Sequence, residues 1–250
     1  MKILIDIKHL IFLSLAFVLF TIIGTVSHEY GHIIVAKSLG YETTLHYGSM
    51  NSYPKGYSND KDVIAFKNLT KDYVDVKYDS WPKELKDKAQ EYKNILEKRY
   101  WNEKSNNDLF ITIGGTLQTT LTGTIGLLFL IWRRKIICKK GMRTLDWLVV
   151  FLSLFWLREV FNLVTSIGGE LISPNGTWFG GDELYISRDL NLWSGTIPII
   201  LATIGTVIAI YVVFKIIPKK IRLTFILSGF VGAIMGFILW MHIIGPKILP

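Results

Sequence analysis

The chain has 250 residues, half of them apolar, and a formal net charge of +8 at pH 7. Its apolar residues are gathered into long blocks, whereas a soluble amphipathic helix or strand spaces them periodically. This distribution is typical of a membrane protein and argues against an ordinary soluble domain. The single cysteine, Cys138, excludes both an internal disulfide and a cysteine-rich zinc site.

Five apolar blocks have the length of a membrane span. Because the hydrocarbon core of a bilayer is about 30 Å thick, a spanning helix needs roughly 20 mostly apolar residues. Suitable blocks run from His9 to about Leu39, from Leu109 to Trp132, from Leu145 to Ile167, from Trp193 to Ile217 and from Leu223 to Ile244. The first is not followed by the small-residue cleavage site of a signal peptide, so we interpret it as an uncleaved span.

The basic residues predict how the chain crosses the membrane. Those without acidic neighbours lie in two short loops, at residues 133–143 and 215–222, and short loops rich in Lys and Arg stay in the cytoplasm. The amino terminus, with Lys2 and Lys8, is expected on the same side. Residues 41–108, residues 168–192 and the carboxyl terminus then fall on the outer side. Contact with anionic membrane lipid explains the net charge better than nucleic acid does, so we expect no nucleic acid partner.

Residues 41–108 form a polar, partly helical extramembrane insert between the first two predicted spans. Turn residues and short alternations, such as residues 72–78, predict turns and one or two short strands in its first half. From Pro82 onward, apolar residues at three- and four-residue spacing predict an amphipathic surface helix; they are Leu85, Ala89, Tyr92, Leu96 and Tyr100.

The predicted fold class is therefore an all-α membrane protein with about five transmembrane helices. Residues 1–40 hold the first transmembrane helix, residues 41–108 the insert, and residues 109–250 four further transmembrane helices with a Gly-Asp loop near residue 180.

The first span carries a metal-binding pattern toward its outer end. Residues 27–32 read Ser-His-Glu-Tyr-Gly-His, which contains His-Glu-x-x-His. Residues four apart on a helix project from one face, so His28 and His32 can bind one zinc ion while the Glu29 carboxylate lies beside it. Zinc activates water, and the carboxylate can pass the water's proton to a leaving amine. Because ionisable side chains are costly inside a membrane, they indicate a functional site.

A catalytic zinc ion usually has three protein ligands, so a third residue is needed. Asp182 follows the third span in the sequence Phe-Gly-Gly-Asp-Glu-Leu, whose glycines allow the backbone to fold back toward the membrane. Glu159 lies within the third span, about 20 Å from its inner boundary at 1.5 Å per residue. An ion pair with a cation such as Arg158 is the alternative interpretation of Glu159. Both carboxylates remain candidates from the sequence.

Together these residues resemble the site-2 protease family of intramembrane zinc metalloproteases. The resemblance rests on the His-Glu-x-x-His motif and the Ile-Ile-Val-Ala after it, on Gly-Gly-Thr-Leu-Gln at residues 114–118, and on the glycine-flanked Asp182. It covers residues from about 20 to 185. It implies that His28, His32 and Asp182 bind zinc and that Glu29 is the general base.

The resemblance also implies contacts to the substrate or to an oxyanion. The glycine stretch, with Gly114 and Gly115, would help to receive an unwound substrate. The Asn-Pro pair that usually precedes the third ligand in the family is missing here, and Asn162 could serve in its place.

We therefore expect a multi-pass integral membrane zinc metalloendopeptidase that hydrolyses peptide bonds of membrane-associated proteins or peptides near the outer leaflet. A non-catalytic membrane protein that binds or transports a metal ion is one alternative. A membrane scaffold in which the motif is accidental is another.

Overall fold

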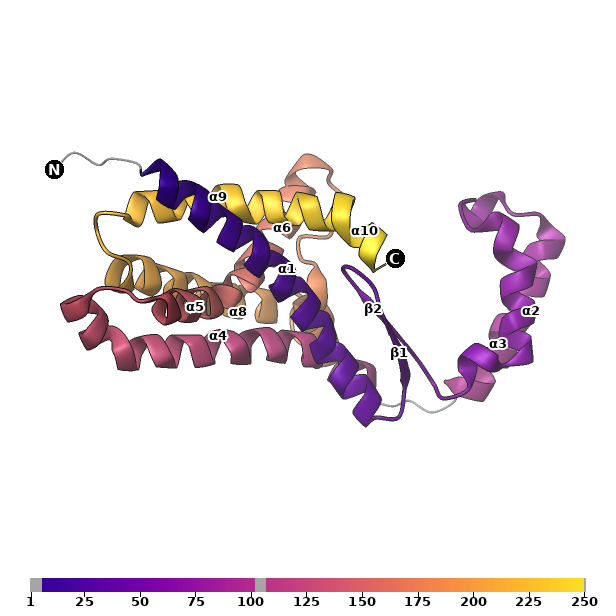
Figure 1. The fold of residues 1–250 in the computed structure, drawn as a ribbon. Coiled ribbons are helices and arrows are strands. Elements are labelled where there is room, and N and C mark those ends of the chain that lie inside the picture. Colours follow the sequence, from indigo (N-terminus) through magenta and orange to yellow (C-terminus); the bar gives the residue numbers. More distant parts are fainter. Residues whose placement is uncertain (1–5, 102–106, 250) are drawn as a thin grey trace.

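A computed structural model describes residues 6–101 and 107–249, and most of these residues are helical. The main body is a bundle of long helices (Figure 1), with α1 (Ile7–Ser38) packed against α4 (Asn107–Lys140) and α9 (Arg222–Ile238). α5 (Thr144–Ser153) continues through a 3₁₀ turn, Leu154–Trp156, into α6 (Leu157–Ile172). The remaining helices of the body are α7 (Gly181–Asp189), α8 (Thr196–Tyr211) and α10 (Gly245–Ile248). π-Helical turns, Val212–Ile216 and Leu239–Ile244, extend α8 and α9.

Four helical segments of the described chain are long and apolar enough to cross a membrane, which indicates an integral membrane protein. They are Ile7–Ser38, Thr144–Ile172, Thr196–Ile216 and Arg222–Ile248, and they match the first, third, fourth and fifth predicted spans. The second predicted span is helical within α4 but is not among the four. Glycine, threonine and glutamine residues between positions 114 and 124 lower the mean hydropathy of this segment. A fifth span therefore stays a prediction.

The ends of the bundle agree with the predicted alternation of the chain. The start of α1, the turn between α4 and α5 and the turn between α8 and α9 lie at one end, and the polar segment between α1 and α4 lies toward the other (Figure 1). The two turns carry the basic residues that predicted a cytoplasmic side. Which side of a membrane this end faces stays a prediction.

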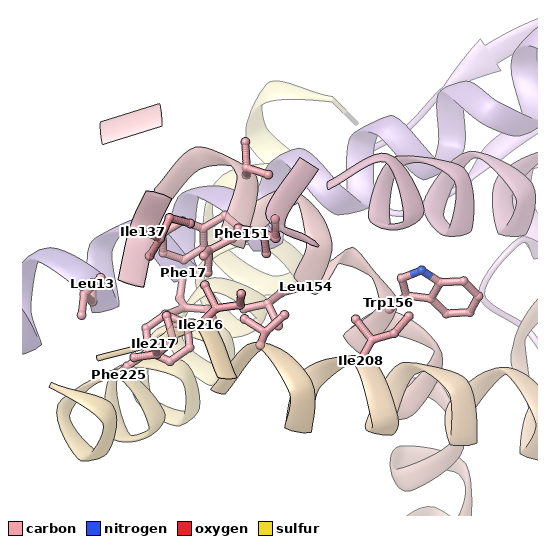
Figure 2. Close-up of a cluster of buried hydrophobic side chains, with 14 residues drawn as sticks. Leu13, Phe17, Ile137, Phe151, Leu154, Trp156, Ile208, Ile216, Ile217 and Phe225 are labelled. Carbon is pink, nitrogen blue, oxygen red and sulfur yellow. The ribbon is translucent and has the colours of Figure 1, made fainter. Parts of the chain in front are cut away.

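An apolar core joins α1, α4, α5, α8 and α9 near the basic end (Figure 2). Phe17 of α1 is at its centre, with its ring centroid 4.9 Å from that of Phe151 and 5.2 Å from that of Phe225. Leu13 and Leu130 are fully buried beside it. Aromatic pairs of this kind stabilise a fold by about 0.5–1.5 kcal/mol beyond the burial of their area. The core holds the amino-terminal half of α1 in place and so positions its carboxyl-terminal half, which bears His28 and His32.

A β-hairpin follows α1 directly. β1 (Glu42–Leu45) pairs antiparallel with β2 (Met50–Tyr53), and these are the two strands of the sheet in the described residues. The hairpin turn is attached to the end of the chain: Trp240 Nε1 donates to the Tyr47 carbonyl at 2.6 Å, and Tyr47 N donates to the Leu249 carbonyl at 2.9 Å.

The one or two short strands expected in the first half of the insert are present as this hairpin, but residues 72–78, whose alternation suggested a strand, do not form one. Those residues include the end of one 3₁₀ turn, Lys71–Tyr73, and the start of another, Tyr78–Ser80. Alternating side chains alone do not make a strand, because a strand also needs a partner for its backbone hydrogen bonds.

Two helices form an arm that stands away from the bundle (Figure 1). α2 (Lys61–Thr70) packs against α3 (Lys83–Tyr100), which confirms the helix predicted after Pro82. Leu85, Ala89 and Leu96 of α3 are buried, as is Val63 of α2. The arm therefore has a small apolar core of its own.

A charged cluster closes the base of the arm. The Arg99 guanidinium hydrogen-bonds to the carboxylates of Asp60 and Asp62, and the Tyr100 hydroxyl donates to Asp60 at 2.8 Å. The Arg99 and Tyr100 hydrogen bonds lower the pKa of Asp60 from 3.8 to about 2. A carboxyl whose pKa is lowered by folding stabilises the folded form above its unfolded pKa, and that contribution is lost as the pH falls through about 2.

We predict that Arg99→Ala loosens the arm and leaves the bundle unchanged. Asp60 and Asp62 lose their shared cation, so amide hydrogen exchange at pH 7 should become faster across residues 61–100 and stay the same in α1 and α4. Lys88→Ala is the control, because its ion pair with Glu84 is solvent-exposed and contributes little. Equal exchange in wild type and Arg99→Ala would contradict this role.

Candidate metal centre

The three ligands that the resemblance implies come together in the structure. His28 and His32 lie one turn apart on α1, and Asp182 is the second residue of α7. Asp182 Oδ2 is 2.8 Å from His28 Nε2 and 3.2 Å from His32 Nε2, and the two Nε2 atoms are 3.1 Å apart. Within the described residues, these three side chains form a group that could hold a metal ion.

The outer nitrogen of each imidazole has a partner on α4. His28 Nδ1 is 2.9 Å from the Thr119 hydroxyl, and His32 Nδ1 is 2.7 Å from the Ile111 carbonyl. A carbonyl can only accept a hydrogen bond, so this contact, shorter than the 3.3 Å from the Gly115 N–H to the same nitrogen, favours a proton on Nδ1 of His32 and a lone pair on Nε2. Partners of this kind set the orientation and tautomer of metal-binding histidines. The sequence did not reveal either partner, because contacts between α1 and α4 depend on the tertiary fold.

The three inner atoms fit a cation. When both rings are neutral and protonated on Nδ1, two imidazole lone pairs and a carboxylate oxygen face one another about 3 Å apart and repel unless a positive charge lies between them. A tetrahedral zinc ion bound at about 2.0–2.2 Å holds its ligand atoms roughly 3.3 Å apart. The observed separations need only a small expansion to meet that value. His28 and His32 are buried, whereas the Asp182 side chain is 27% exposed, so the group lies at the edge of the protein interior.

Glycines on α4 make room for the imidazoles. A Cβ added to Gly115 would collide with the rings of both His28 and His32. Next to it, a Cβ on Gly114 would lie 2.6 Å from the carbonyl oxygen of Gly31 on α1. These glycines therefore allow α1 and α4 to meet backbone to backbone at the depth of the ligands. Contact of Gly114 and Gly115 with a substrate stays a prediction.

Glu29 is buried beside the ligand group, with 5% of its surface exposed. Its Oε1 lies 4.0 Å from Nη2 of Arg158 on α6. Arg158 therefore approaches Glu29, and the ion pair considered for Glu159 is replaced by this one. The Glu29 carboxylate and the Arg158 guanidinium therefore lie together next to the three candidate ligand atoms.

Glu159 lies outside the ligand group. It is 1% exposed, and no hydrogen-bond donor reaches its carboxylate oxygens. It interacts instead with Glu183, a second buried carboxyl that directly follows Asp182. Asn162 Nδ2 donates to Glu183 Oε1 at 2.9 Å, so Asn162 is held close to the ligand-bearing turn. The sequence analysis did not single out Glu183, because Asp182 next to it already supplied a candidate third ligand in the Gly-Gly-Asp-Glu segment.

The fold and this group of side chains define a helical membrane protein with a buried candidate metal centre. No protein-family model, no curated protein and no solved structure matches the chain. The resemblance to site-2 proteases is thus a hypothesis that rests on the motif residues and their geometry.

We predict that Gly115→Ala abolishes stoichiometric metal binding. The added methyl group occupies the space of both imidazoles, so the rings must turn away from Asp182 or α4 must separate from α1. Zinc content of the purified protein, measured by elemental analysis, checks this. Gly169→Ala on α6 is the matched control, since its Cβ would meet nothing within 4 Å, and it should keep its zinc. Equal zinc in both variants would show that the close packing is not required.

Proposed function

We propose that the protein is a membrane-embedded zinc metalloendopeptidase acting on membrane-associated proteins or peptides. The observation that supports this is the meeting of three acceptor atoms, from His28, His32 and Asp182, beside the buried carboxylate of Glu29. A bound zinc ion supplies a Lewis acid that polarises a carbonyl group and makes water more acidic.

The residues around the ion have separate roles in this proposal. Glu29 accepts a proton from the attacking water and delivers it to the leaving nitrogen. Arg158, 4.0 Å from Glu29, helps to orient that carboxylate. Asn162 uses one amide hydrogen for Glu183, and its second hydrogen is available to an oxyanion of the substrate.

The depth of the site supports a membrane substrate. His28 lies ten residues before the end of α1, about 15 Å along the helix axis. A substrate helix at that depth keeps its carbonyls hydrogen-bonded, so the target segment must be unwound before attack. A site at this depth favours segments that already lie in or on the membrane.

We predict that Glu29→Gln separates catalysis from metal binding. The variant keeps the size and shape of the side chain but cannot take a proton, so hydrolysis of a membrane-anchored reporter should fall by about 100-fold or more. Zinc content should stay at one ion per chain. Glu91→Gln, on the arm, is the control and should retain activity. A zinc-loaded wild type that cleaves nothing, or a fully active Glu29→Gln variant, would favour a non-catalytic role in metal binding or transport.

We also predict that Asp182 and Glu159 differ in their effect on zinc. Asp182→Ala removes one of three ligands and should weaken zinc binding by more than the roughly 10–100-fold typical of losing a supporting hydrogen bond. Glu159→Ala should retain one zinc ion per chain. Titration of the metal-free variants with zinc checks both. Retention of zinc by Asp182→Ala together with its loss from Glu159→Ala would reverse the assignment.

A further inference from the structure

An open cavity of about 280 Å³ lies between α4, the 3₁₀ turn at residues 154–156, α7 and α8, and the half-exposed Leu117 and Leu121 of α4 are among its lining residues. Its walls are mostly apolar and include Ile113, Thr116, Thr120, Trp156, Ile186 and Leu201. We call it the Thr116 cavity. At this volume it is close to the lower limit of pockets that bind small molecules, about 300 Å³. It is therefore of a size to take one side chain, and too small for a helix.

The Thr116 cavity adjoins the metal centre through two of its walls. Thr116 directly follows Gly115, the residue that packs against both imidazoles. Ile186 is one helical turn beyond Asp182 on α7. Consecutive Cα atoms of an extended peptide are 3.8 Å apart, and its successive side chains point to opposite faces. A peptide whose scissile bond lies at the candidate metal centre can therefore direct one of the two flanking side chains toward the cavity.

One polar atom in the wall has no partner. Thr116 is 6% exposed, and its Oγ1 is buried without a hydrogen bond. The hydroxyls of Thr112 and Thr120 on the same helix donate to backbone carbonyls one turn earlier. A buried hydroxyl without a partner is unfavourable, and a peptide group can satisfy it, whereas a lipid acyl chain cannot.

We propose that the Thr116 cavity binds the apolar side chain next to the scissile bond of the substrate, while the Thr116 hydroxyl hydrogen-bonds to the substrate backbone. This inference rests on the proposed peptidase function and specifies its substrate class. Peptides with a medium-sized aliphatic or aromatic residue at that position are preferred. A charged residue there is disfavoured, because the apolar wall leaves its charge unpaired.

Peptide hydroxamates test the cavity without relying on catalysis, because the hydroxamate group binds zinc directly. The probes carry Gly, Leu, Phe or Asp next to the hydroxamate, and their affinities for the zinc-loaded full chain in detergent are measured by calorimetry. The Leu and Phe probes should bind at least about 10-fold more tightly than the Gly probe. The Asp probe should show no gain.

Substitutions that fill the cavity test whether the tighter binding of the Leu and Phe probes arises there. Thr120→Phe fills the cavity and should remove the preference for Leu over Gly while the Gly probe binds as before. Leu201→Phe fills it from the opposite wall and replaces Thr120→Phe if that variant does not fold. Thr112→Phe is the matched control: the same substitution on the same helix, at a residue outside the cavity lining, and it should keep the preference. Thr116→Val should weaken every probe by roughly 3–10-fold, and Thr116→Ser should restore binding.

The outcomes distinguish this inference from the proposed function. If the Gly probe does not bind the zinc-loaded protein, both proposals are overturned, because the ion is then closed to substrates. If the Gly probe binds but Leu and Phe give no gain, or if the gain survives both filling variants, the cavity proposal fails and the peptidase proposal stands.

Discussion

The close contact between α1 and α4 is the constraint on which the site depends. Gly31 and Gly114 bring the two backbones together, and Gly115 leaves space for the imidazoles of His28 and His32. In a membrane, where the hydrophobic effect does not drive helices together, small residues at such contacts allow close van der Waals packing. The same contact brings Thr119 and the Ile111 carbonyl to the outer nitrogens of the rings. Packing and metal-ligand orientation therefore have one structural cause.

The site concentrates polar groups at a depth where they are costly. Asp182, Glu29, Glu159 and Glu183 all lie close together, with Arg158 as the nearby cation. Buried carboxyls in such numbers are unfavourable unless cations or shared protons compensate them. A divalent ion among His28, His32 and Asp182, as proposed here, would supply part of that compensation. The arrangement is easier to explain as a metal site than as a structural core, because apolar side chains of similar size would stabilise a core better.

The sequence could predict the features that depend on local periodicity. Helix geometry alone places His28 and His32 on one face, and glycines beside Asp182 indicate a turn that can return to them. The helix after Pro82 followed from its apolar spacing. The positions of the strands at residues 42–45 and 50–53, the buried carboxyl of Glu183 and the role of Thr119 as a partner of His28 were not predicted. Each of these depends on partners distant in the chain, which no local pattern of side chains reveals.

The composition of α4 is explained by its position between the candidate metal centre and the proposed substrate cavity. One face supplies Gly115, Thr119 and the Ile111 carbonyl to the histidines, and another lines the Thr116 cavity with Thr116 and Thr120. Both faces need small or hydroxyl-bearing residues where a simple membrane span would have leucine or isoleucine. These residues explain why α4, although 34 residues long, is less apolar than the four clearest candidate spans. If α4 both supports a metal centre and contacts a substrate, as proposed, its lower hydropathy is the cost of these contacts, while its packing against α1 and α5 holds it in the bundle.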